Sequence, residues 1–296
     1  MSGSMESLGR KIASAGDLES VVRSMKALAA SSVGQYEMAV ESLRDYYRTV
    51  ELGLTACLRQ DEASSLVPEH SAAGSARKDA VVFGSDQGLV GRFNEVLLEF
   101  ALSTLNALPG KTSSIWVVGE RLHALIADTG MIEVSLLSVP TSVHTITPRV
   151  DEILVAIEAG REQVQTGRVL VFHNRPKSGA VYEPVVKQLL PLDQVWRSSA
   201  AAPPWPTRLL PQVIDDADTT LQALIREYLF VVLFQACAES LASENASRLA
   251  AMQRADKNIQ TILEDLNRRY HRVRQESIDE ELFDVIAGYE AMLKAR

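Results

Sequence analysis

The sequence has few of the residues that build catalytic or metal centres. Its two cysteines, Cys57 and Cys237, lie far apart and belong to no CxxC or Cys/His cluster, so neither a disulfide framework nor a zinc site is expected. The five histidines are scattered and form no HExxH or Ser/His/Asp pattern. The acidic pairs Asp215-Asp216 and Glu280-Glu281 are typical of solvated helix faces or helix starts. The sequence therefore predicts no catalytic residue, no metal and no cofactor.

A basic surface and a targeting segment are also missing. The net charge is -8 and the isoelectric point is near 5.3, which argues against a nucleic-acid partner because phosphate binding needs clustered Lys and Arg. The N-terminus has neither the apolar core of a signal peptide nor an Arg-rich transit pattern. The most apolar helical stretch, 228–234, is much shorter than the roughly 20 residues of a membrane span. We expect a buried helix turn there, and reduced thiols on the cytosolic side.

Proline is absent from both ends of the chain. All 11 prolines lie between Pro68 and Pro211, and since proline breaks helix interiors, the two flanks are free to form long helices. Apolar and small residues recur there in steps of three and four, as in a heptad seam. In the N-terminal flank this seam is Val22, Met25, Ala29, Ser32, Tyr36, Ala39, Leu43, Tyr46, Val50, Gly53 and Cys57. The helix begins either after Asp17, which has the side chain of an N-cap and follows Gly16, or earlier in the chain, because the seam does not fix its start.

The C-terminal flank carries a longer seam with one skip. Its positions are Leu224, Tyr228, Val231, Gln235, Ala238, Ala242, Asn245, Leu249, Met252, Asp256, Ile259, Leu263, Leu266, Tyr270 and Val273, and then Ile278, Leu282, Val285, Tyr289 and Met292. A helix over 216–294 would be on the order of 100 Å long. The shorter first helix covers only part of it. The remainder must lie against another chain or stand bare, and a bare apolar stripe is unfavourable.

Between the flanks, short apolar runs alternate with amphipathic helices. Strands are expected at 80–84, 114–119 and 169–173, with 132–139 a further candidate and 182–190 an edge strand, and helices at 94–108, 120–128 and 149–165. This order predicts a three-layer α/β domain with a mostly parallel sheet. The predicted fold class is therefore a long antiparallel coiled coil flanking a central α/β domain. The expected boundaries are a helix over 1–60, a linker over 61–78, the α/β domain over 79–210 and a helix over 211–296.

The glycine-rich segment GSDQGLVGRFNE, residues 84–95, follows an expected strand. A dinucleotide fingerprint needs GxGxxG, and a phosphate loop needs a terminal GK followed by Ser or Thr. The segment has neither. The alternative interpretation is structural: the glycines supply a tight strand-to-helix turn, with Asn94 near the helix start.

The whole chain resembles the gamma subunit of the F-type ATP synthase, which is the central rotor shaft. Residues 84–94 are similar to the family's (T/G)SDRGLCGxxN element. Ser240, Glu244, Arg248, Met252 and Asn258 stand in the family's spacing S-x-x-x-E-x-x-x-R-x-x-A-M-x-x-A-x-x-N. Residues 270–278 are similar to YNRxRQxxI, and residues 21–29 to ITKAMKMVA.

The resemblance implies roles for particular residues. Arg23, Met25 and Lys26 would meet the acidic lever loop of a catalytic beta subunit, and Arg274 and Gln275 would hydrogen-bond its catch loop. An α/β foot resting on the membrane c-ring and the epsilon subunit would be shaped by Ser85, Asp86, Gln87, Gly88, Leu89, Gly91 and Asn94. The chain itself would be non-catalytic, with alpha, beta, epsilon and the c-ring as partners, on the cytoplasmic side of the inner (plasma) membrane.

The sequence departs from the family at several positions. Ser20, Ser32 and Gly34 stand where basic residues are usual, and Gln87 and Val90 replace Arg and Cys. Fewer cations weaken attraction to an acidic lever, which suggests a divergent member such as the gamma subunit of the alternate, often sodium-linked F-type ATPases. Two other hypotheses remain open at this stage. One is a coiled-coil scaffold or adaptor with an inserted α/β domain, and the other is a nucleotide-dependent enzyme that uses 85–94.

Overall fold

A computed structural model describes residues 2–59, 77–127, 129, 134–163, 167–177, 180–192, 196, 198, 205 and 216–294. The chain divides into two compact units. We call Met1–Ala29 with Leu249–Arg296 the helical unit, and Ala30–Arg248 the α/β unit. The expected linker over 61–78 and the stretch 200–206 lie almost wholly outside the described residues. The domain boundaries at 60, 78 and 210 stay a prediction.

The α/β unit is built on a five-stranded sheet in the order β3-β2-β1-β4-β5. Strands β1 to β4 pair in parallel, and β5 adds an antiparallel edge to β4. The expected strands are all present, including the edge strand, so the mostly parallel sheet is confirmed. Their bounds are β1 Arg77–Phe83, β2 Lys111–Val118, β3 Val134–Leu137, β4 Arg168–Lys177 and β5 Ala180–Leu190.

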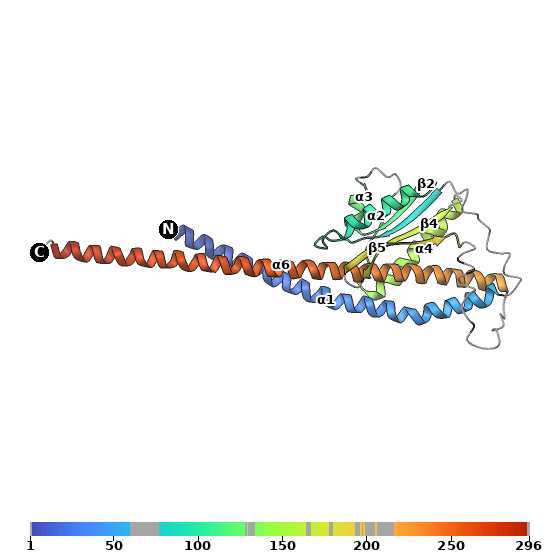
Figure 1. The fold of residues 1–296 in the computed structure, drawn as a ribbon, viewed down its shortest axis with the longest axis horizontal. Coiled ribbons are helices and arrows are strands. Elements are labelled where there is room, and N and C mark those ends of the chain that lie inside the picture. Colours follow the sequence, from blue (N-terminus) through green and yellow to red (C-terminus); the bar gives the residue numbers. More distant parts are fainter. Residues whose placement is uncertain are drawn as a thin grey trace. The chain divides into compact units, whose positions relative to one another are not determined.

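Helices cover both faces of the sheet, which confirms the three layers (Figure 1). Alternate residues of β1 divide between the two sides, because successive strand side chains point to opposite faces. Ala80 and Val82 pack with α2 (Phe93–Ala107) and α3 (Glu120–Ala127). Val81 and Phe83 pack in a second cluster with α4 (Ile146–Gln163), which follows the short helix η3 (Val143–Thr145), and with α6 (Ala217–Lys294).

The two terminal helices are continuous, as the absence of proline predicted. Helix α1 covers Ser2–Leu58, and α6 begins after Asp216, whose carboxylate accepts the backbone N–H of Thr219 at 3.1 Å. Of the two possible starts of the first helix, the earlier one is correct: the helix begins at Ser2, and Asp17 lies inside it rather than at its N-cap. An added Cβ at the preceding Gly16 would meet nothing within 4 Å. No steric reason stops the helix at that glycine.

The seam of α6 is confirmed as far as Val273. Every seam position from Leu224 to Val273 is buried or half-buried. After the skip the described seam side chains Ile278, Leu282 and Val285 are exposed, as expected where the first helix no longer covers the second. In α1 the prediction fails at Tyr46. This side chain is exposed, and its hydroxyl donates to Glu227 Oε2 at 2.6 Å.

One segment of α6, Asp218–Ala287, is long and apolar enough to cross a membrane by length and composition alone. Its most apolar stretch lies inside the protein. Val231, Val232, Leu233 and Phe234 are all buried in the core that α6 shares with the sheet. The expected buried helix turn at 228–234 is therefore present.

Candidate functional site

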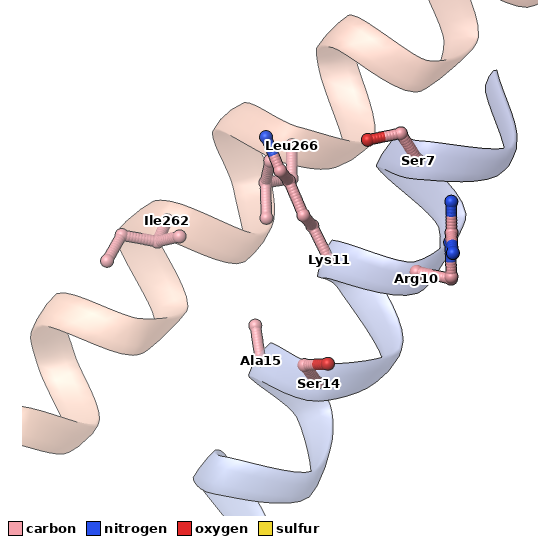
Figure 2. Close-up of a pocket in the computed structure, with 7 residues that line it drawn as sticks. All are labelled: Ser7, Arg10, Lys11, Ser14, Ala15, Ile262 and Leu266. Atoms are coloured by element: carbon pink, nitrogen blue, oxygen red, sulfur yellow. The ribbon is translucent and has the colours of Figure 1, made fainter. Parts of the chain in front are cut away.

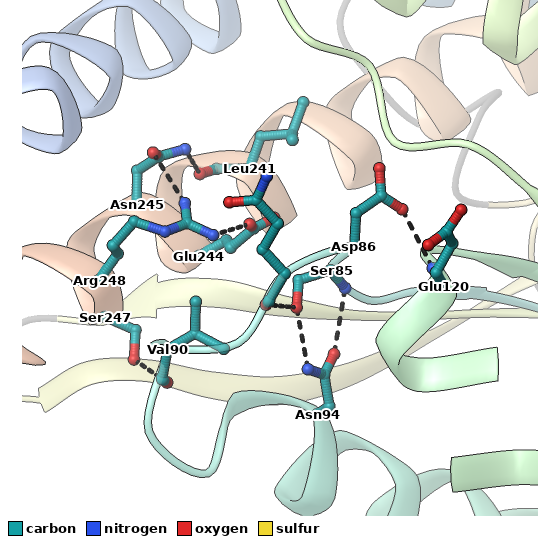
Figure 3. A network of polar contacts seen from close by, with 11 residues as sticks. Ser85, Asp86, Val90, Asn94, Glu120, Leu241, Glu244, Asn245, Ser247 and Arg248 are labelled. Atoms are coloured by element: carbon teal, nitrogen blue, oxygen red, sulfur yellow. Dashed lines mark hydrogen bonds and ion pairs between the residues drawn. The ribbon is translucent and has the colours of Figure 1, made fainter. Parts of the chain in front are cut away.

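The glycine-rich segment joins β1 to α2 and is closed by two reciprocal hydrogen bonds. The Ser85 backbone N–H donates to Asn94 Oδ1 at 3.1 Å, and Asn94 Nδ2 donates to Ser85 Oγ at 2.9 Å (Figure 3). Both residues are buried. Helix α2 begins at Phe93 with Arg92 in the cap position, so Asn94 lies near the helix start as expected. Its side chain hydrogen-bonds Ser85 at the other end of the segment and so closes the loop. Neither Ser85 nor Asn94 offers a surface to a partner.

The start of α3 is already occupied by an acidic side chain. Asp86 Oδ1 accepts the Glu120 backbone N–H at 3.0 Å, at the position where a bound phosphate would meet helix N–H groups. Gly119, just before the helix, has φ +115, and a Cβ there would lie 2.7 Å from the carbonyl carbon and oxygen of Ser85. The close approach of these two backbones therefore depends on the glycine. This geometry supports the structural interpretation of the segment over a nucleotide loop.

The tip of the segment points away from the core. Gln87, Gly88, Leu89 and Gly91 are exposed, and Leu89 is 62% accessible. Leu89 also has φ +63, a left-handed conformation that is uncommon for residues other than Gly, Asn and Asp. A large apolar side chain held outward on such a backbone makes this tip a candidate contact surface.

Three serines of α6 bind the ends of other elements. The Ser240 hydroxyl donates to the carbonyl of Phe83 at 2.9 Å, and that of Ser243 donates to the carbonyl of Asn174 at 3.1 Å. The Ser247 hydroxyl donates to the carbonyl of Val90 in the glycine-rich segment (Figure 3). All three serines are buried. Of the three serines, only Ser240 belongs to the family motif on α6. Ser243 and Ser247 could have been found from their spacing to Ser240, because the three serines recur every three or four residues along an apolar helix.

Two further polar contacts lie beside these serines. His173 Nε2 of β4 is 2.8 Å from Glu239 Oε2, and Lys187 Nζ of β5 donates to Gln235 Oε1 at 3.1 Å. Burial lowers the pKa of His173, although the hydrogen bond with Glu239 opposes this shift. The imidazole is therefore neutral at pH 7 and donates its Nε2–H to the carboxylate. Its Nδ1 is buried and has no hydrogen-bond partner among the residues that the structure describes. No motif or spacing in the sequence indicates the pair of His173 and Glu239.

The family motif on α6 forms an internal network. Arg248 donates to Glu244 Oε1 at 2.5 Å and to Asn245 Oδ1 at 3.2 Å, and Asn245 Nδ2 donates to the carbonyl of Leu241 at 2.8 Å (Figure 3). Burial raises the pKa of Glu244, and the neighbouring Arg248 opposes this shift. Glu244 and Arg248 thus satisfy each other inside the protein, and their motif spacing is that of an i, i+4 ion pair.

In the helical unit, α1 and α6 meet through a small apolar cluster. Val22, Met252 and Ile259 are buried together, and Met25 packs half-buried against them. Lys26 Nζ lies 2.5 Å from Asp256 Oδ2. Of the residues expected to meet an acidic lever loop, Met25 and Lys26 are therefore partly engaged within the chain. The motif residue Asn258 is exposed.

The remaining cations of the expected beta-subunit contact point to solvent. Arg23 is 64% accessible in its side chain and pairs with Glu19 of the same helix at 2.9 Å. Arg274 and Gln275 are both exposed on α6. An exposed ion pair such as Arg23–Glu19 contributes little to stability. Arg23 can therefore leave Glu19 and bind a partner subunit at a small cost in free energy.

A shallow groove of about 490 Å³ lies between the first turns of α1 and the facing part of α6 (Figure 2). Ala15, Ile262 and Leu266 give it an apolar floor, and Arg10 and Lys11 bring two cations to it. Lys11 reaches across toward Leu266 in Figure 2. An apolar floor with cations beside it suits an acidic segment that carries an apolar side chain.

Comparisons with known proteins identify the family. A family model described as ATP synthase matches residues 4–292. The chain is 27% identical to the ATP synthase gamma chain of Rhizorhabdus wittichii, covering 98% of this chain and 99% of that protein. It is 26% identical to the gamma chain of Paraburkholderia phymatum, covering 97% and 99%.

Solved structures show the same fold. One is a chain from the rotor of the Euglena gracilis mitochondrial ATP synthase, with a TM-score of 0.62 and 14% identity over 94% of this chain and 100% of that chain. Another comes from the central stalk and c-ring of the Tetrahymena thermophila enzyme, with a TM-score of 0.57 and 18% identity over 79% and 99%. This chain therefore belongs to the ATP synthase family, and the relatives that it matches along nearly its whole length are gamma chains.

Proposed function

We propose that this chain is the central-stalk rotor subunit, gamma, of an F-type ATP synthase or ATPase. In this role it couples the flow of H⁺ or Na⁺ through a membrane ring to ATP synthesis or hydrolysis on a hexamer of alpha and beta subunits. The observation that carries the proposal is that similarity to gamma chains spans 98% of the sequence. It therefore includes both terminal helices as well as the α/β unit.

The mechanism is mechanical, and the chain is non-catalytic. The ring turns the α/β unit, and α1 and α6 transmit the rotation to the surrounding subunits. Because the two helices differ in length and side chains, each beta subunit meets a different face and is biased to a different conformation, which changes its affinity for nucleotide. Phosphoanhydride chemistry takes place on beta. The chain needs no cofactor and binds no nucleic acid.

The contacts with beta use side chains of the helical unit. Arg274 and Gln275 engage a catch loop, where a guanidinium can hold a carboxylate with two hydrogen bonds. Arg23, Met25 and Lys26 meet an acidic lever loop. Arg23 is the more exposed of the two cations: it pairs with Glu19 of its own helix, whereas Lys26 is half-buried and held by Asp256 of α6. Because Asp256 neutralises Lys26, the electrostatic attraction between α1 and an acidic lever loop is weaker than the number of cations on α1 suggests.

The α/β unit is the foot of the rotor, and its partners are the c-ring and the epsilon subunit. Its contact surface includes the exposed tip of the glycine-rich segment, Gln87, Gly88, Leu89 and Gly91. Ser85, Asp86 and Asn94 shape that tip from beneath. The complex is peripheral to the inner (plasma) membrane on its cytoplasmic side.

Affinity purification from native membranes tests the proposal. The tagged chain is expected to bring down alpha and beta subunits in a complex that hydrolyses ATP, while the purified chain alone has no activity. Recovery of the chain without a hexameric head, or ATP hydrolysis by the lone chain at the rate of a full complex, would overturn the assignment. A stable symmetric dimer of the lone chain in size-exclusion chromatography would favour the scaffold hypothesis instead.

A further inference from the structure

Within the α/β unit, helix α6 is fastened to the sheet and to the glycine-rich segment by five polar side chains on one side of the helix. We call them the polar key: Gln235, Glu239, Ser240, Ser243 and Ser247. At about 3.6 residues per turn they span an arc of roughly 140°. Their partners lie in four parts of the unit: Lys187 in β5, His173 and the carbonyl of Asn174 in β4, the carbonyl of Phe83 in β1, and the carbonyl of Val90 in the glycine-rich segment.

The serines of the key depart from the usual behaviour of serine in helices. A serine inside a helix commonly bonds a carbonyl of its own preceding turn, as Ser24 does with Ser20 in α1. Ser240, Ser243 and Ser247 instead donate to carbonyls of the sheet and of the glycine-rich segment. The position and rotation of α6 are thereby tied to the main chain of other elements.

The apolar contacts around the key hold α6 in a different way. Val232 and Leu233 pack α6 against the core beneath the sheet. Apolar burial is non-directional, so it resists separation of the helix more than small rotations of the helix in place. A hydrogen bond weakens steeply as its angle departs from linear. The key is therefore the part of the interface that best resists rotation of α6 about its own axis.

The key also stands where the helix leaves the α/β unit. This unit ends at Arg248, one residue after Ser247, and α6 continues to Lys294. Any twist applied to the α/β unit enters the rest of α6 through its last fixed turns. Those turns contain Ser240, Ser243 and Ser247.

We propose that the polar key is the torsional coupling between α6 and the rest of the α/β unit, namely its sheet and its glycine-rich segment. Its residues act by positioning the helix and touch no nucleotide. This inference rests on the rotor function proposed above and names the contacts through which torque enters the shaft. Without them, α6 stays attached through the chain and the apolar core but rotates more loosely against the α/β unit.

The test is single-molecule rotation of the complex of this chain with alpha and beta, with the head fixed to a surface. A rigid probe is attached to the α/β unit through Ser103→Cys, because Ser103 is exposed on α2 whereas the native Cys57 and Cys237 are buried. The angular variance during the pauses between steps reports torsional stiffness. In S240A/S243A/S247A we expect this variance to rise about twofold or more, since three directional contacts are lost. In the single variant S243A we expect a smaller rise.

Leu233→Ala is the matched control. It removes a fully buried apolar contact of the same helix with the same unit, so it destabilises the protein without touching the key. We expect its variance to stay near the wild-type value. The proposal is overturned if the serine variants do not raise the variance, or if L233A raises it as much. A wild-type chain that does not assemble and rotate with alpha and beta refutes the rotor function instead, so the two failures are distinct.

Discussion

Replacing Gly119 with alanine is expected to destabilise the α/β unit strongly. The added Cβ would lie 2.7–2.8 Å from the backbone N, C and O of Ser85, and the residue has φ +115. The surrounding backbone is held on both sides, because Gly119 N–H donates to the Leu137 carbonyl at 2.9 Å and Arg121 N–H donates to the Ser85 carbonyl at 3.0 Å. Relief by a simple shift would therefore break hydrogen bonds.

The magnitude follows from two separate costs. A non-glycine residue held in such a backbone conformation costs about 1–3 kcal/mol. Forcing an additional carbon into a packed site costs about 1–3 kcal/mol more. We therefore expect the free energy of unfolding to fall by about 4 kcal/mol in G119A. For a chain of this size each kcal/mol lowers the melting temperature by about 2–4 °C.

Gly88→Ala provides the control, because Gly88 lies in the glycine-rich segment that also contains Ser85, the residue Gly119 approaches. Gly88 is exposed, and a Cβ there would meet no atom of the described part of the chain within 4 Å. The change in the free energy of unfolding should therefore stay within about 0.5 kcal/mol. Urea unfolding of the full chain, followed by tryptophan fluorescence, to which the buried Trp116 of β2 contributes, measures both variants. If G119A unfolds within about 1 kcal/mol of wild type, or if G88A is as damaging, the structural role assigned to these glycines is wrong.

Three further predictions concern charge. Lys26→Met should lower the free energy of unfolding by about 1–2 kcal/mol. This value lies between those of exposed and buried ion pairs, because the Lys26 side chain is one-third exposed while that of Asp256 is nearly buried. Adding D256N to the same chain should restore part of the lost stability, and additive losses in this double-mutant cycle would contradict the pairing. The lowered pKa of His173 means that the unfolded chain binds a proton below about pH 6.5 that the folded chain resists. Stability should therefore fall as the pH drops from about 7.5 to 5.5, and His173→Gln should flatten this slope in thermal unfolding; identical slopes would refute it. Carbodiimide treatment of the complex should cross-link Lys11 in the groove to a carboxylate of alpha or beta, which mass spectrometry detects. The exposed Lys111 of the α/β unit is the control and should not cross-link to either subunit. Equal cross-linking of both lysines would contradict binding of an acidic segment in the groove.

The helices and strands were readable from the sequence because their signals are local. The seam of α6 from Leu224 to Val273 was placed by residue spacing alone, and each position is buried or half-buried. Local patterns did not decide the structure where two outcomes were physically possible for the same residue. Asp17 has the chemistry of an N-cap, but nothing in the residues before it stops the helix from starting at Ser2. Tyr46 continues the apolar period, yet its hydroxyl finds Glu227 at the surface.

The sites were less accessible to sequence reasoning. Burial of Ser85 and Asn94, and the engagement of Lys26 by Asp256, depend on which segments meet. The resemblance to gamma chains indicated that these positions matter without saying how each is held. Their roles in contacts with beta, epsilon and the ring stay predictions.

By itself, the order of residues determined two proline-free helices, a mostly parallel α/β domain between them and the family to which the chain belongs, because periodicity and motif spacing are properties of neighbouring positions. Only the tertiary structure decided what holds α6 in place. Ser240 donates to a carbonyl 157 residues away, and every residue carries the same carbonyl group. Folding alone selects which carbonyl meets the serine, so side-chain identity cannot reveal that partner.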